Sequence, residues 1–269
     1  MFKAKHKMVL ALTILTAVSA PSVQAVVFAE ESNPGNAPLV GGGPGLLYNN
    51  TPSMRMLTVL GSPLLYAPMS SVTQFMTPKE GDADSVRIYQ IKGSSGIKIP
   101  GILGTFEGVW TFARVGSSDV WFGEWDAENS AGDKVPNTHN VFYIGPGGLS
   151  GKRANVMNID FSGPITYNIK SINNYSGAAA PSSVLTAHFG NSTASSVGDI
   201  SFTNGNIVVG GGLSNLGAFT ASNVSVASAG GTGGTLSGQF FENGAASVAG
   251  IVTFSDRNKN TAFGGVKNQ

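Results

Sequence analysis

The chain has 269 residues, of which 12% are charged, 37 are glycine and none is cysteine. Its formal net charge is +1 and becomes −2 when the three lysines of the first 25 residues are removed, so the charge balance excludes a nucleic-acid partner. The lack of cysteine excludes a disulfide framework, a thiolate metal site and a lipid-modified cysteine. The many small polar residues beside Val, Ile and Phe favour a mainly β, exported protein.

Residues 1–29 have the layout of a secretory signal peptide. Lys3, Lys5 and Lys7 precede an apolar run over residues 8–18, which is too short to span a membrane as a helix. Small residues allow cleavage after Ala25 or after Ala29. The sequence therefore predicts export through the periplasm, secretion from the cell and no stable membrane insertion.

Residues 30–148 are expected to form a small mixed domain that binds a ligand. Between residues 46 and 76, prolines and glycines interrupt the apolar clusters and neither a period of 2 nor of 3.6 is present, so loops and one short helix are expected. Four strand-like segments follow, at residues 85–93, 107–115, 119–126 and 140–145. The stretch 145–151, GPGGLSG, interrupts this pattern and marks the expected domain boundary.

Residues 149–269 alternate apolar and polar side chains in short segments separated by turns. Eight or nine such strands fit an eight-stranded antiparallel β-barrel, because closure removes exposed strand edges. A two-sheet sandwich is the alternative, and periodicity does not separate the two. The segments are residues 155–163, 165–172, 185–189, 200–202, 207–209, 219–226, 236–240, 252–254 and 261–267.

The end of the chain resembles the barrel domains of transferrin-binding protein B and its relatives. The resemblance is carried by a Gly-x-Phe-Phe strand at Gly238–Phe241, an Asn-Gly turn at Asn243–Ala246, a glycine-containing strand at Ala249–Phe254 and a final Phe-Gly-Gly at Phe263–Gly265. Residues 155–172 resemble the opening hairpin of the same barrels, so the resemblance extends from residue 155 to the C-terminus.

Within this group, the chain resembles the hemophilins, which are soluble secreted heme carriers and lack a lipid-modified cysteine. The resemblance implies a monomeric hemophore that binds one heme b in its N-terminal domain, for uptake or to withhold it from competitors. It also implies an outer-membrane heme receptor and a Slam-type export factor as partners. The alternative is a surface or secreted module that binds a host protein without a small ligand.

Heme iron needs an axial donor, and after signal removal His139 and His188 are the remaining histidines. His188 alternates with Leu185 and Ala187, so it is expected on the outer face of the barrel. His139 follows a Pro-Asn-Thr turn, and the resemblance favours it as the axial ligand over an ordinary loop histidine. A tyrosine ligand is a further possibility, with Tyr48, Tyr66, Tyr89 and Tyr143 available.

The remaining candidate residues would enclose the porphyrin. Met54 and Met56 are flexible and polarizable enough to cover it, although the same side chains would equally fill the core of a small domain. Arg55, Arg87 and Arg114 are candidate partners for propionates, or ordinary surface charges. With two histidines in such different settings, no catalytic triad or zinc site is evident and enzymatic activity is not expected. The full predicted site is His139 on iron, with Tyr48, Met54, Met56, Phe142 and Tyr143 around the cofactor.

Overall fold

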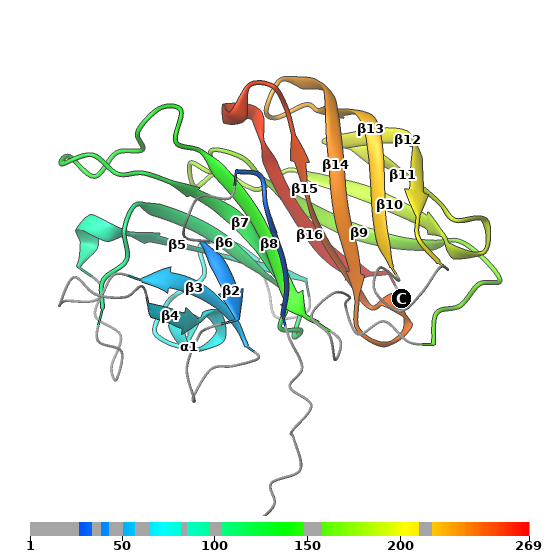
Figure 1. The fold of residues 1–269 in the computed structure, drawn as a ribbon, viewed down its shortest axis with the longest axis horizontal. Coiled ribbons are helices and arrows are strands. Elements are labelled where there is room, and N and C mark those ends of the chain that lie inside the picture. The colour runs from blue at the N-terminus through cyan, green and yellow to red at the C-terminus, as the bar shows by residue number, and fades with distance from the viewer. Residues whose placement is uncertain are drawn as a thin grey trace, which may run out of the picture.

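The computed structural model describes residues 27–33, 39–42, 51–56, 65–81, 85–96, 104–147, 158–209 and 217–268. They form an N-terminal five-stranded antiparallel sheet in the order β1-β8-β7-β6-β5, a small sheet in the order β2-β3-β4, and a closed barrel (Figure 1). In this part of the chain no helix is long and apolar enough to cross a membrane.

The five-stranded sheet confirms the four strands expected between residues 85 and 145. Its strands are β1 (Val27–Glu31), β5 (Val86–Lys92), β6 (Val109–Val115), β7 (Trp121–Asp126) and β8 (Asn140–Pro146). A short 3-10 turn, η1 (Gly93–Ser95), follows β5. Strand β1 pairs antiparallel with β8, so that Val27 lies opposite Pro146.

Both faces of this sheet are buried. On β8, Val141 and Tyr143 belong to the apolar core that the sheet shares with the barrel, whereas Phe142 and Ile144 belong to a second core on the other side. Glycine allows the close approach of sheet and barrel, because a Cβ added at Gly264 would lie 2.5 Å from the Phe122 ring. The N-terminal domain is therefore packed directly against the barrel rather than tethered beside it (Figure 1).

The prediction of loops over residues 46–76 was wrong for two segments, β3 (Pro52–Met56) and β4 (Leu65–Pro68), which form a small sheet with the preceding strand β2 (Val40–Gly42). The expected short helix is α1 (Met69–Thr73). Met54, Met56 and Met69 are fully buried in the second core. The strands lacked a period-2 signal because β3 is buried at nearly every position, which removes the alternation.

The C-terminal part is the expected eight-stranded antiparallel barrel. Pairing of β16 with β9 closes it, which excludes the sandwich. Tyr167, Phe189, Phe219, Phe240 and Phe263 fill the interior. Its strands are β9 (Ile165–Ile172), β10 (Ser182–His188), β11 (Thr193–Gly198), β12 (Ile200–Ile207), β13 (Ala218–Val226), β14 (Gly231–Phe241), β15 (Ser247–Thr253) and β16 (Thr261–Lys267), with short 3-10 turns η2 (Phe189–Asn191), η3 (Asn243–Ala245) and η4 (Arg257–Lys259).

Three details of the predicted barrel were wrong. The first expected strand, 155–163, is not a strand at its described positions from residue 158 onward, and Phe161 is 53% exposed. Residues 207–209 are not a separate strand, because Ile207 ends β12. Strand β11 was missed, since its inward residues are the small Ala194 and Ser196 while Val197 is 75% exposed.

One hydrogen bond inside the barrel provides a test of its packing. The Tyr167 hydroxyl donates to the carbonyl oxygen of Ala245 at 2.7 Å in a buried setting. Replacing Tyr167 by Phe leaves that carbonyl without its donor, and we expect the free energy of unfolding to fall by about 1–3 kcal/mol. Urea unfolding followed by far-UV circular dichroism measures the change, and a loss below about 0.3 kcal/mol would contradict the hydrogen bond.

Candidate functional site

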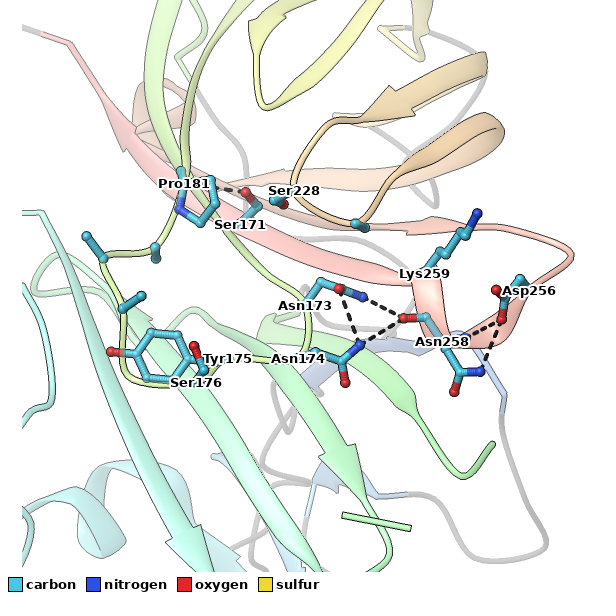
Figure 2. A pocket seen from close by; sticks show the side chains of 14 residues that line it. Ser171, Asn173, Asn174, Tyr175, Ser176, Pro181, Ser228, Asp256, Asn258 and Lys259 are labelled. Atoms are coloured by element: carbon cyan, nitrogen blue, oxygen red, sulfur yellow. Dashed lines mark hydrogen bonds between the residues drawn. The ribbon is translucent and has the colours of Figure 1, made fainter. Parts of the chain in front are cut away.

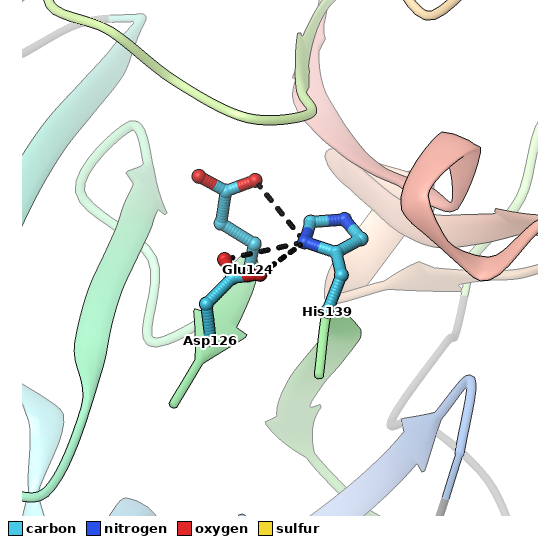
Figure 3. A group of neighbouring side chains, drawn as sticks. All are labelled: Glu124, Asp126 and His139. Atoms are coloured by element: carbon cyan, nitrogen blue, oxygen red, sulfur yellow. Dashed lines mark hydrogen bonds and ion pairs between the residues drawn. The ribbon is translucent and has the colours of Figure 1, made fainter. Parts of the chain in front are cut away.

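His139 lies just before β8, and it is 1% exposed rather than presented on an open loop (Figure 3). Its Nδ1 is 3.2 Å and 3.3 Å from the two carboxylate oxygens of Asp126, at the end of β7. Its Nε2 is 2.9 Å from the carbonyl oxygen of Asn260 in the barrel. A carboxylate and a carbonyl only accept hydrogen bonds, so both ring nitrogens donate and the side chain is an imidazolium.

The imidazolium belongs to a group of four charges, Glu124, Asp126, Lys134 and His139, which we call the junction cluster. Three of them are buried and Lys134 is partly exposed. The Nζ of Lys134 lies 2.7 Å from Glu124 Oε1 and 3.0 Å from Asp126 Oδ2, and Glu124 is wholly buried. Two carboxylates face two cations, so the cluster is formally neutral.

The pKa values of the cluster move as these charges require. Burial by itself would lower the pKa of His139, but the hydrogen bond to Asp126 and the charges of Glu124 and Asp126 raise it above 6.5. Burial by itself would raise the pKa of Asp126. The hydrogen bond to His139 and the positive charges of His139 and Lys134 outweigh this effect and lower the pKa. The two carboxylates likewise raise the pKa of Lys134 against the effect of burial. In each of the three groups the pKa therefore moves in the direction that favours the charged form.

Glu124, Asp126 and His139 have donor atoms within 4.8 Å of one another, which is close enough to bind a metal ion. Lys134 already supplies the compensating positive charge to both carboxylates. The imidazolium also has no free lone pair for a metal. The arrangement is consequently an ion-pair network in this conformation.

The junction cluster connects the N-terminal sheet to two loops of the barrel. Glu124 accepts hydrogen bonds from the backbone N–H groups of Asn174 and Tyr175 in the loop after β9. Arg257 in η4 donates to the carbonyl oxygens of His139 and Thr138, at 2.9 Å and 3.1 Å. These contacts tie residues far apart in the chain, so the cluster stabilises the junction of the two parts.

A polar pocket of about 550 Å³ lies beside this junction (Figure 2). The loop after β9 forms one wall, with Asn173 and Asn174 donating to the carbonyl oxygen of Asn258 from η4. Asp256, Lys259 and Ser228 contribute further polar groups. This lining differs from the apolar, aromatic walls expected around a porphyrin.

The structure does not bring the predicted site residues onto one surface. His139 and Tyr143 face the barrel, and the Tyr143 hydroxyl donates to Glu30 at 2.8 Å. Met54, Met56 and Phe142 lie in the core on the opposite side of the sheet. Tyr48 lies outside the described residues.

His188 follows the expected parity, since Leu185, Ala187 and Phe189 are buried and His188 is partly exposed. Sequence reasoning did not single out Glu124, Asp126 and Lys134. The spacing of Glu124 and Asp126 on one face of a strand was a usable signal, because two carboxylates on a buried face require cationic partners.

Family models decide the relationship of this chain to known proteins. Residues 11–139 match the model described as the HphA N-terminal heme-binding domain. Residues 157–267 match the model of the HphA C-terminal domain. The chain belongs to the HphA family. This confirms the resemblance to the hemophilins.

The HphA heme-binding model contains most of the predicted site. It includes Tyr48, Met54 and Met56 and ends at His139, whereas Phe142 and Tyr143 follow it. The HphA C-terminal model covers the whole closed barrel. The junction cluster therefore lies where the heme-binding domain of the family meets its C-terminal domain.

Solved structures similar to this HphA-family chain share a low sequence identity with it. A double mutant of transferrin-binding protein B from Haemophilus parasuis is 12% identical, with a TM-score of 0.46 over 90% of this chain and 45% of that one. The protein from serogroup B Neisseria meningitidis is 12% identical, with a TM-score of 0.45 over 91% and 44%. The N-lobe domain of lactoferrin-binding protein B of Moraxella bovis is 11% identical, with a TM-score of 0.33 over 91% and 98%. The chain spans less than half the length of the first two.

Proposed function

We propose that this protein is a secreted hemophore that binds one heme b through its N-terminal domain, residues 30–148, with the barrel, residues 149–269, as a second domain. The observation that carries the proposal is the match of residues 11–139 to a heme-binding domain. Cleavage of the signal peptide after Ala25 fits the fold better than cleavage after Ala29, since the latter would remove three of the five residues of β1. Export then proceeds through the periplasm to the outside of the cell.

His139 is the proposed axial ligand of the heme iron. The hydrogen bond between Nδ1 and Asp126 is the kind of contact that fixes the ring orientation of a ligating histidine. Ligation through Nε2 requires that His139 lose one proton and its contact with the Asn260 carbonyl. Tyr143 shares the barrel-facing side of the sheet with His139, so it would contact the same cofactor, and Met54, Met56 and Phe142 would support the sheet from behind.

The partners follow from this role. A secreted carrier transfers its heme to an outer-membrane receptor, and a Slam-type factor delivers the carrier to the cell surface. The protein acts as a monomer in this proposal. Its cargo serves either uptake by the producing cell or denial of heme to competitors.

A hemin titration of the secreted protein tests the function. We expect a saturable Soret band with one heme bound per chain, followed by absorbance spectroscopy and checked by native mass spectrometry. Absorbance that equals the sum of the protein and free hemin at every concentration would refute the hemophore and leave the binding of a host protein as the better function.

A further inference from the structure

Two arginines lie directly opposite each other on the N-terminal sheet. Arg87 on β5 and Arg114 on β6 are cross-strand partners in the antiparallel register. Successive side chains of a strand point to opposite faces of the sheet. Val86 and Ile88 belong to the barrel-facing core, so Arg87 between them points to the opposite face, as Tyr89 does. Arg114, its cross-strand partner, points to that same face. Like charges directly opposite each other destabilise a sheet unless an anion compensates them.

Arg114 has protein partners that orient it. Its Nε and Nη2 donate to the carbonyl oxygens of Ser118 and Ser117 at 2.7 Å and 2.8 Å, and its Cζ lies 5.6 Å from the centre of the Trp121 ring. The Asp119 carboxylate next to it accepts from Trp121 Nε1 at 2.8 Å. Within the described residues, Asp119 is thus a carboxylate beside Arg114, and no ion pair is present at Arg87.

Arg87 differs from Arg114 in its hydrogen bonding. Its Nε is buried and, in the described part of the chain, has no hydrogen-bond partner. An unsatisfied buried donor on a charged group is costly, so a ligand that accepts from it gains a strong, charge-assisted bond. Because the guanidinium group presents donors in a planar fork, a carboxylate or a phosphate matches its geometry.

We propose that Arg87 and Arg114 form a binding site for an oxyanion on the face of the N-terminal sheet away from the barrel. The oxyanion is either a free small ion such as phosphate or a propionate carboxylate of a bound heme. Arg114 is fixed by its two carbonyl contacts, and Arg87 completes the site with its unpartnered Nε.

This site is separate from His139. Arg114 pairs with Trp121 at the start of β7, while Asp126, which contacts His139, ends that strand. Five residue steps along a strand correspond to about 17 Å. His139 also faces the other side of the sheet, where its Nε2 contacts Asn260 of the barrel. A heme ligated by His139 would not reach both arginines, so a propionate in this site excludes ligation of the same heme by His139. Binding of a free oxyanion does not depend on His139 or on the proposed function.

Thermal unfolding of the full chain in increasing phosphate, at constant ionic strength, tests the free-ion source. Arg87→Gln removes the fork, and Lys267→Gln, at an exposed position of the barrel, is the control with the same change of charge. We expect phosphate to raise the Tm of the parent and of Lys267→Gln, with binding at least about tenfold weaker in Arg87→Gln. Without phosphate, Arg87→Gln should unfold at the same temperature as the parent or higher, because the charge repulsion is relieved.

The propionate source is tested with hemin and its dimethyl ester, which lacks free carboxylates. If the site takes propionates, hemin binds the parent at least about tenfold more tightly than the ester, and Arg87→Gln removes that difference while retaining the Soret band. That result would support the oxyanion site and overturn His139 as the ligand of the same heme. Equal responses of the parent and Arg87→Gln to both phosphate and hemin would overturn the oxyanion site, whether or not the protein binds heme.

Discussion

Replacement of Glu124 by glutamine is expected to lower the free energy of unfolding by about 3–5 kcal/mol, a large part of the stability of a typical domain. The carboxylate is wholly buried, contacts Lys134 at 2.7 Å and accepts two backbone N–H groups from the barrel loop after β9. Glutamine removes the charge and places an NH₂ group where an acceptor is needed, so at least one backbone donor is left unsatisfied. Urea unfolding followed by tryptophan fluorescence measures the loss.

The matched control for this substitution is Glu107→Gln. The Glu107 side chain is exposed, and within the described residues its backbone carbonyl accepts hydrogen bonds from Trp110 and Trp125. Its replacement should change the stability by less than about 0.5 kcal/mol. Similar small effects for both variants would show that the junction cluster does not stabilise the fold.

A double-mutant cycle with Lys134→Met separates the ion pair from the backbone contacts. Lys134 is 24% exposed, so its removal alone should cost less than the removal of Glu124. The coupling energy between the two positions should be about 1–3 kcal/mol. A coupling near zero would assign the effect of Glu124 to its contacts with Asn174 and Tyr175.

Replacement of His139, the proposed ligand, by alanine is expected to shift the Soret band and to accelerate the loss of heme to a scavenger. Removal of the iron–nitrogen bond leaves the burial of the porphyrin, which contributes roughly 25 cal/mol for each Å² of apolar surface, so affinity should fall without vanishing. His188→Ala should keep the parent spectrum, because His188 lies partly exposed on the outside of the barrel.

His139 also stabilises the junction, so its variant needs a second control. Asn173 donates to the same Asn260 carbonyl as His139, at 2.8 Å. Asn173→Ala therefore weakens the junction without removing an imidazole, and it should lower the Tm while leaving the Soret maximum unchanged. An unchanged Soret maximum in His139→Ala, together with a lowered Tm, would restrict His139 to the junction and reject it as the ligand.

The sequence by itself predicted the strands that have one buried face and one partly exposed face. Strands such as β9 and β10 alternate buried and partly exposed residues, so the pattern indicated both their existence and the outward position of His188. The number of such segments predicted an eight-stranded barrel, and the closing Phe-Gly-Gly carried the resemblance to the barrels of transferrin-binding protein B and its relatives. Local alternation is sufficient here because each strand has one face inside the barrel.

Only the tertiary structure decided the features that depend on distant partners. Strand β3 is buried on both faces by packing, so its sequence showed no alternation and was read as a loop. His139 is buried because Asn260, 121 positions away in the chain, covers its Nε2, and no local pattern around a Pro-Asn-Thr turn encodes that contact. Adjacent residues of β8 also point to opposite sides of the sheet, which is why Phe142 and Tyr143 do not share a surface. Composition indicates which side chains are present, but packing between the sheet and the barrel determines which of them meet.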